Sequence, residues 1–193
     1  MTRAGGLEPT IRRMGVPGDL GWVVMANAEL YAAEFGWDAS FEVLAARIVA
    51  DYAAGADPSR EAGWVAELEG ARVGCVLCTA GDEPGTAKLR LLAVLPAARG
   101  RALGSRLVAT TLDFARAAGY ERMQLWTNHP LAAARRIYLR HGFGLVKEEP
   151  HRSFGADLVG QTYELDLRGT DHRPGQPSTY EMNSSSEPSG SRK

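Results

Sequence analysis

The sequence lacks the features that mark several large classes of protein. Its formal net charge over 193 residues is −1, so no global basic field indicates a nucleic-acid partner. It has no apolar run long enough to cross a bilayer, and residues 1–10 lack the apolar stretch of a secretory signal. The apolar fraction of 45% is ordinary and permits a buried core. We therefore expect one soluble, cytoplasmic domain with no nucleic acid and no membrane as a partner.

Cysteine is also scarce, and its two occurrences form a C-x-x-C pattern, Cys75 and Cys78. The surrounding residues read as a buried strand, on which positions three apart point to opposite faces. A zinc site would need two further ligands, and the histidines His129, His141 and His151 are too scattered to supply them. We predict that both cysteines are core residues, that the histidines have surface or capping roles, and that no metal is bound.

Apolar periodicity and turn residues predict the order of the elements. A strand at 10–15 is followed by a helix that begins at Asp19 as N-cap and runs to about Tyr31. The remaining predictions are a helix from 38 to about 56, strands at 64–68, 73–80 and 88–95, a helix at 103–118, a strand at 123–127, a helix at 130–141, and strands at 143–148 and 161–167, with an irregular segment at 151–160.

The ends of the chain differ in composition from its middle. Residues 169–193 consist of Ser, Pro, Gly and charged residues with almost no apolar content, which is typical of a disordered tail. We also expect residues 1–9 to be disordered, which leaves one domain at 10–168. Its three consecutive strands favour an antiparallel meander, and its later strand–helix–strand units favour crossovers. The order therefore predicts a mixed sheet flanked by helices.

The most informative segment runs from Leu92 to Ser105. An apolar strand ends at Pro96, a loop rich in Arg and Gly follows, and a helical pattern begins directly after it. This arrangement presents backbone N–H groups to a diphosphate, and Arg99, Arg101 and Arg106 add positive charge. The loop is neither a Walker A motif nor a G-x-G-x-x-G fingerprint. The alternative is a surface turn whose arginines are merely solvated.

A second segment, Ala134-Arg-Arg-Ile-Tyr-Leu-Arg-His-Gly-Phe143, follows the loop after one helix and one short strand. Together the two segments resemble the GNAT superfamily of N-acetyltransferases over about residues 10–168. Segments 31–38 and 151–162 are further similar to the acetyltransferase half of bacterial winged-helix regulator–acetyltransferase fusions. The chain has no room for the regulator half, so we expect no DNA-binding role.

The resemblance implies a fold of the α/β (α+β) class, with a mixed, mostly antiparallel sheet of six to seven strands and about four helices. It also implies acetyl-CoA as co-substrate. The backbone N–H groups of the loop would hold the coenzyme A pyrophosphate, and the backbone of the preceding strand would pair with the pantetheine arm. These positions are Arg99, Gly100, Arg101, Ala102, Leu103, Gly104 and Ser105 for the loop, and Leu92, Ala93 and Val94 for the strand.

The loop departs from the family pattern at Ala102, where the family prefers glycine. If the backbone at this position must be left-handed, alanine destabilises it by about 1–2 kcal/mol relative to glycine. If the position requires only a small side chain, alanine costs little. The family often has Asn at the position of Leu131, so Asn128 is the alternative contact to the cofactor arm.

The resemblance places the general acid at Tyr138, which would protonate the departing thiolate. The alternative is an aromatic residue packed beside Ile137. The strand at 88–93 carries no carboxylate, so Glu34 is the candidate base, with a solvated helix-end glutamate as the alternative. Aromatic residues could form the acceptor wall or simply belong to the core: Tyr31, Phe35, Trp37, Trp126 and Phe154.

These observations predict an acetyl-CoA-dependent N-acetyltransferase that acts by direct attack of a primary amine from a small molecule or peptide. The first alternative is a non-catalytic acyl-CoA-binding regulatory or interaction module, which the departures at Ala102 and Leu131 favour. The second is a nucleotide-binding domain, which the absence of a P-loop lysine disfavours. An exposed final strand would permit a homodimer.

Overall fold

The computed structural model describes residues 8–55 and 57–169. Most of the ends predicted to be disordered, 1–9 and 169–193, lie outside the described residues. The elements are β1 (Thr10–Arg13), α1 (Asp19–Phe35), α2 (Ala39–Gly55), β2 (Ala62–Leu68), β3 (Ala71–Ala80), β4 (Thr86–Val94), the short 3₁₀ helix η1 (Pro96–Ala98), α3 (Leu103–Ala117), β5 (Arg122–Asn128), α4 (Ala132–Arg140), β6 (Gly144–Ser153) and β7 (Ala156–Asp166).

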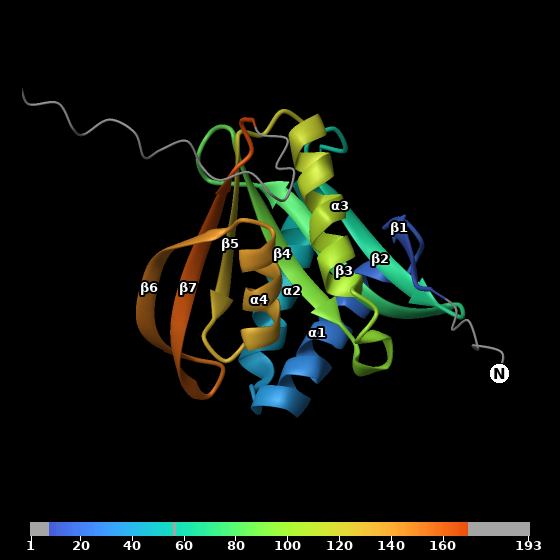
Figure 1. The fold of residues 1–193 in the computed structure, drawn as a ribbon. Coiled ribbons are helices and arrows are strands. Elements are labelled where there is room, and N and C mark those ends of the chain that lie inside the picture. The colour runs from blue at the N-terminus through green and yellow to red at the C-terminus, as the bar shows by residue number, and fades with distance from the viewer. Residues whose placement is uncertain (1–7, 56, 170–193) are drawn as a thin grey trace, which may run out of the picture.

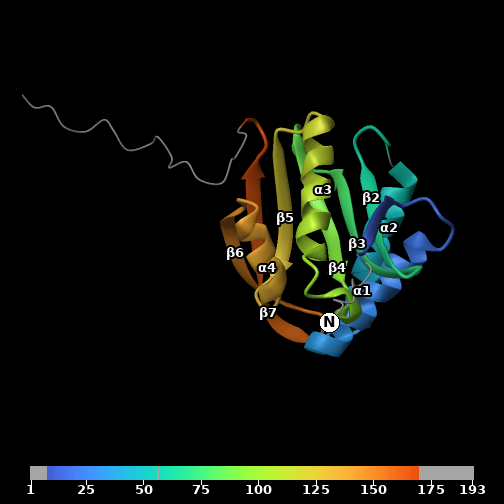
Figure 2. The ribbon, with the colours of Figure 1, turned by 45° about the vertical axis from the view of Figure 1, so that its right-hand side comes forward.

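The strands form one seven-stranded sheet in the order β1-β2-β3-β4-β5-β7-β6. Strands β4 and β5 pair in parallel across the α3 crossover, and the other neighbouring strands pair antiparallel. Helices α3 and α4 lie on one face of the sheet and α1 and α2 on the other (Figures 1 and 2). The predicted mixed, mostly antiparallel sheet with four flanking helices is confirmed. No helix in the described ranges is long and apolar enough to cross a membrane.

Each face of the sheet has its own apolar core. The larger core packs α3 and α4 against the sheet, and the other packs α1 and α2 against β3 and β4. Cys78 belongs to the first core and Cys75 to the second, and both are free thiols with no exposed surface. The prediction of two core cysteines on opposite faces of one strand is therefore confirmed.

The segment 151–160, predicted to be irregular, is a β-hairpin. Strands β6 and β7 pair from Gly144 to the turn at Phe154 and Gly155, which have φ of 56° and 76°. Two left-handed residues form the turn that suits the twist of a hairpin, but a phenylalanine at the first position gives no sequence signal for it. Pro150 is tolerated because β6 is an edge strand. The final strand β7 lies between β5 and β6, so the prediction that it is an exposed edge is wrong.

Helix α1 extends one turn beyond its predicted end. It continues past Tyr31 to Phe35 and ends at Gly36, whose φ of 68° closes the helix in a left-handed conformation. Glu34 therefore lies in the last helical turn and not in the break between the two helices.

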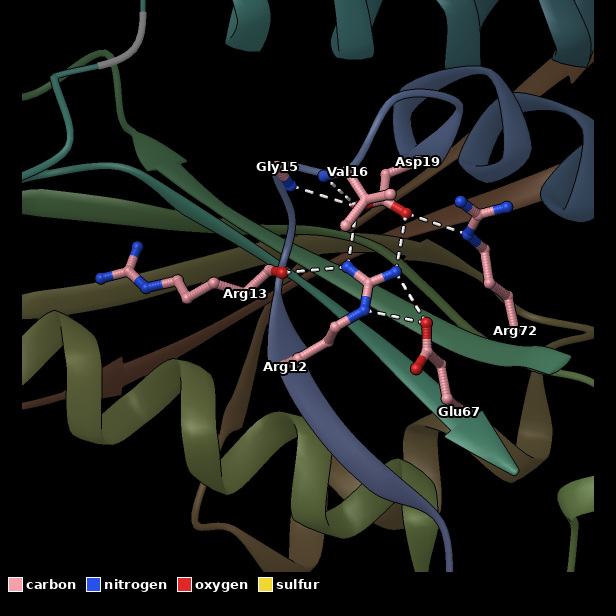
Figure 3. A network of polar contacts seen from close by, with 7 residues as sticks. All are labelled: Arg12, Arg13, Gly15, Val16, Asp19, Glu67 and Arg72. Atoms are coloured by element: carbon pink, nitrogen blue, oxygen red, sulfur yellow. Dashed lines mark hydrogen bonds and ion pairs between the residues drawn. The ribbon is translucent and has the colours of Figure 1, made fainter. Parts of the chain in front are cut away.

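The N-terminus of α1 also differs from the prediction, because Gly18 and not Asp19 occupies the N-cap position. The Asp19 side chain is 1% exposed and accepts hydrogen bonds from Arg12 at 2.8 and 2.9 Å and from Arg72 at 2.9 Å (Figure 3). Its carboxylate also accepts the backbone N–H groups of Gly15 and Val16 at 3.1 and 3.0 Å. Asp19 thus ties the first helix to β1 and β3.

Candidate active site

The sheet is split between its two parallel strands. The ladder between β4 and β5 ends at Leu89 and Leu125, and beyond this point the strands diverge (Figure 1). Leu91 adopts a left-handed conformation with φ 52°, and the pairing of β4 with β3 shifts register beside it. This bulge turns the end of β4 away from β5. The backbone of Leu92–Val94 is therefore left without a strand partner on the β5 side.

Two buried polar side chains hold the bulge. The Cys75 thiol donates to the Leu91 carbonyl at 3.3 Å, and Asn27 Nδ2 donates to Cys75 Sγ at 3.4 Å and to the Val23 carbonyl at 2.8 Å. Burial raises the pKa of Cys75 to about 12, so this thiol keeps its proton and remains a donor. Cys75 thus fixes the backbone of the split in addition to filling the core.

A cavity of about 640 Å³, here called the loop cavity, lies between α1, the end of β4, the loop before α3, and α4 with the residues that precede it. It collects most of the predicted cofactor residues together with the candidate base: Leu92, Ala93, Val94, Arg99, Gly100, Ala102, Leu103, Gly104, Ser105 and Glu34. Two predicted contacts, Arg101 and Asn128, do not line this cavity.

The loop and the first turn of α3 give the loop cavity its donors. Gly100 and Ala102 have φ of 78° and 53°, and Ala102 is the N-cap of α3. The position where alanine replaces the usual glycine is therefore left-handed. A Cβ on Gly104 would lie 2.7 Å from Ile137 Cδ1, so the small residue lets α3 approach α4 closely. The unpaired N–H groups of a 15-residue helix thus border the cavity.

Positive charge dominates the loop cavity. Arg99, Arg136 and Arg140 line it, and Glu34 is the one carboxylate among its lining residues in the described part of the chain. Glu34 forms an ion pair with Arg99 across the cavity, and its side chain is 28% exposed. Ser105 Oγ lies 2.7 Å from His141 Nε2, and burial lowers the pKa of that histidine. Such an arrangement favours an anionic ligand that approaches the helix N-terminus.

A second cavity, of about 580 Å³ and here called the aromatic cavity, lies on the α1–α2 face of the sheet. Trp37 and Phe154 have ring centroids 4.9 Å apart, and the Tyr31 and Phe41 rings are also 4.9 Å apart. Four of the five predicted wall residues line this cavity: Tyr31, Trp37, Trp126 and Phe154. The fifth, Phe35, lines the loop cavity instead.

The two cavities meet where the sheet is split. Both are lined by Tyr31, Leu92, Leu131 and Ala134. The Tyr31 hydroxyl donates to the Leu92 carbonyl at 3.4 Å, which fixes the aromatic ring at this junction. A ligand held in the loop cavity can therefore reach a second ligand in the aromatic cavity through the opening between β4 and β5.

Tyr138 comes from α4 and lines the aromatic cavity. Its side chain packs against the rings of Phe143 and Tyr163, with centroids 5.9 and 6.4 Å away. Within residues 8–55 and 57–169 its hydroxyl makes no hydrogen bond. Burial raises the pKa of Tyr138 well above its usual range, so the hydroxyl stays protonated and can act as a donor.

His151 was predicted to have a surface or capping role, but it lines the aromatic cavity. Its Nε2 donates to Asn128 Oδ1 at 2.8 Å, and its Nδ1 lies 3.0 Å from Ser153 Oγ. Its ring centroid is 5.5 Å from that of Trp126. Asn128, predicted as a cofactor contact, thus belongs to the aromatic cavity. No sequence pattern indicates this cluster, because the segment that carries His151 and Ser153 reads as irregular and not as a hairpin.

No group of three or more His, Cys, Asp or Glu side chains that could hold a metal ion occurs among the residues that the structure describes.

The comparisons with known proteins agree with this geometry. Residues 25–143 match the acetyltransferase (GNAT) family. An uncharacterized N-acetyltransferase of Schizosaccharomyces pombe is 32% identical over 149 residues, which cover 74% of this chain and 85% of that protein. A structure from Salmonella typhimurium, described as an acetyltransferase with its cofactor acetyl-CoA, has a TM-score of 0.68 at 21% identity and covers 90% of this chain and 99% of its own. A GNAT-family acetyltransferase of Staphylococcus aureus has a TM-score of 0.70 at 14% identity, covering 83% and 99%.

Proposed function

Since the chain belongs to the acetyltransferase (GNAT) family, we propose that it transfers the acetyl group of acetyl-CoA to a primary amine of a small molecule or peptide. The observation that carries this proposal is the meeting of the two cavities at the split between β4 and β5. One cavity suits an anionic cofactor, and the other suits an apolar acceptor.

Acetyl-CoA is proposed to occupy the loop cavity. The N–H groups at the start of α3 would bind its pyrophosphate, with Arg99, Arg136 and Arg140 as counter-charges. The free backbone of Leu92–Val94 would pair with the amide groups of the pantetheine arm, which directs the thioester toward the junction. The similar structure from Salmonella, which contains acetyl-CoA, supports this choice of cofactor.

The reaction proposed at the junction is direct attack. The neutral amine nitrogen forms a bond to the thioester carbon, the carbon–sulfur bond breaks, and the sulfur leaves as a thiolate. Tyr138 then gives its proton to that sulfur, which a buried phenol without a competing hydrogen-bond partner in the described residues is well placed to do. The amide nitrogen then loses its extra proton, the Tyr138 phenolate regains one, and the products are an N-acetyl amine and coenzyme A.

Two groups are candidates to take the proton from the amine. Glu34 lines the loop cavity in its ion pair with Arg99, whereas His151 lines the aromatic cavity, into which the acceptor is proposed to bind. The base sets the acidic limb of the pH profile of kcat/KM. Loss of that limb in His151→Gln and not in Glu34→Gln would assign the base to His151, and the reverse result would assign it to Glu34.

The proposed function is tested by coenzyme A release from acetyl-CoA across a panel of primary amines, followed with a thiol reagent. We expect release that depends on both the protein and the amine, and a rise in melting temperature on addition of acetyl-CoA. Binding of acetyl-CoA without release for any amine would favour a non-catalytic acyl-CoA-binding module. Absence of a thermal shift with any acyl-CoA would contradict both.

A further inference from the structure

The aromatic cavity is lined by cations but by no carboxylate among the described residues. Lys88 and Arg90 extend from β4 onto the face that carries α1 and α2. Lys88 has an ion-pair partner, Asp82, at 2.5 Å, whose side chain is 90% exposed. Arg90 forms no hydrogen bond and no ion pair within residues 8–55 and 57–169, and Asp82 acts on it only through space. A partly buried guanidinium is thus available at the cavity wall.

The carboxylates beyond the cavity wall are already engaged. Glu164 accepts a hydrogen bond from Gln124 at 3.0 Å and lies 4.0 Å from Arg122, and Glu148 accepts one from Gln161. Neither lines the cavity. A simple amine, which is protonated near neutral pH, would enter this cavity beside the unpaired guanidinium of Arg90 and would meet no carboxylate among the described lining residues. An acceptor that brings its own negative charge would remove this penalty and pair with Arg90.

We infer that the acceptor is an amine that also carries a carboxylate on an apolar body, which is the chemistry of a free amino acid with a large apolar side chain. Its carboxylate pairs with Arg90, with Lys88 beside it, and its apolar body packs on the rings of Trp37, Phe41 and Phe154. The inference rests on the proposed function and narrows its acceptor class. Amines that carry no negatively charged group near the amino group are therefore not expected to be preferred substrates.

The test compares acceptors that differ only at the carboxylate: L-phenylalanine, L-phenylalaninamide and 2-phenylethylamine. We expect kcat/KM for L-phenylalanine to exceed that of either neutral analogue by about ten- to hundredfold, as a charge-assisted pair provides. Arg90→Met should reduce this ratio to below threefold, and Arg90→Lys should retain part of it. Arg47→Met, which removes an exposed arginine from α2, is the matched control and should keep the ratio of the wild type.

A second measurement separates failure of this inference from failure of the proposed function. Calorimetric titration of L-phenylalanine into the coenzyme A-loaded protein reads binding without any transfer step. Binding that Arg90→Met weakens tenfold or more supports the inference even if no acetyl transfer is observed. Equal kcat/KM for the three acceptors, a preference for the neutral analogues, or a preference that survives in Arg90→Met would overturn it.

Discussion

At the scale of single residues, Ala102 adopts a backbone conformation that suits glycine better. Its φ of 53° at the N-cap of α3 is left-handed, which costs an L-residue with a Cβ about 1–2 kcal/mol. Glycine loses more freedom on folding, which offsets part of the gain. We expect Ala102→Gly to raise the free energy of unfolding by about 1 kcal/mol in chemical denaturation. A lower free energy of unfolding for Ala102→Gly would show that the contacts of the Ala102 side chain stabilise the fold by more than its left-handed backbone costs.

The two cysteines give a second prediction at this scale. Burial raises the pKa of both Cys75 and Cys78 to about 12, and the thiolate is the reactive form. In the native protein at pH 8 we expect a disulfide reagent to label neither thiol, and both to react after unfolding in guanidinium. Rapid labelling of one thiol in the native protein would contradict the structure, and would also interfere with the coenzyme A assay.

At the scale of elements, the start of α1 depends on one buried carboxylate. Asp19 forms ion pairs with Arg12 of β1 and Arg72 of β3 (Figure 3). The hydrogen bond from Arg12 is the main reason that the pKa of Asp19 lies well below its usual range. Removing the carboxylate leaves both arginines without their partner. Because these arginines are partly exposed, water can solvate them, which reduces the loss of stability. We expect Asp19→Asn to lower the free energy of unfolding by roughly 2–4 kcal/mol at pH 7.

The sign of the pH dependence follows from the lowered pKa. The folded carboxyl has a lower pKa than the unfolded one, so its contribution is complete above the unfolded value of about 3.9. It is lost as the pH falls below that value. Because the loss is complete only below the lowered pKa of the folded state, the stabilities of the wild type and of Asp19→Asn in urea denaturation should approach each other steadily as the pH falls from 5 and should still differ at pH 3. A difference in stability that stays constant over this range would contradict the assigned network.

The elements also show which parts of the fold could be predicted. Helix α3 and the loop before it were recognised because glycine, arginine and apolar spacing are local signals. The β6–β7 hairpin was missed because Phe154 occupies a turn position that usually holds Asn, Asp or Gly. The split of the sheet has no local signal either, because Leu91 is a bulky residue in a left-handed conformation that tertiary contacts impose.

At the scale of the whole molecule, the candidate site combines residues from both faces of the sheet. The loop cavity draws its lining from α1, from residues 92–105 and from residues 130–140, and the continuous segment 92–105 could be predicted because its residues are neighbours in sequence. The aromatic cavity joins Arg90 on β4, Tyr138 on α4 and His151 on β6, which only the strand order brings together. Sequence reasoning therefore named many of the residues that line the loop cavity, and in the aromatic cavity it named Tyr138, Asn128 and four aromatic residues; the roles of these residues stay predictions.

The central claim is that acetyl transfer takes place where the two cavities meet, with Tyr138 as proton donor. The most direct test is the kinetics of Tyr138→Phe with acetyl-CoA and an amine that supports turnover. Because Tyr138 does not line the loop cavity, we expect kcat to fall about a hundredfold while the Kd for acetyl-CoA stays within about twofold. Because burial raises its pKa, this residue should impose no loss of wild-type activity between pH 7 and pH 9. A Tyr138→Phe variant with the kcat of the wild type, or one whose acetyl-CoA affinity falls in proportion to its activity, would contradict the claim.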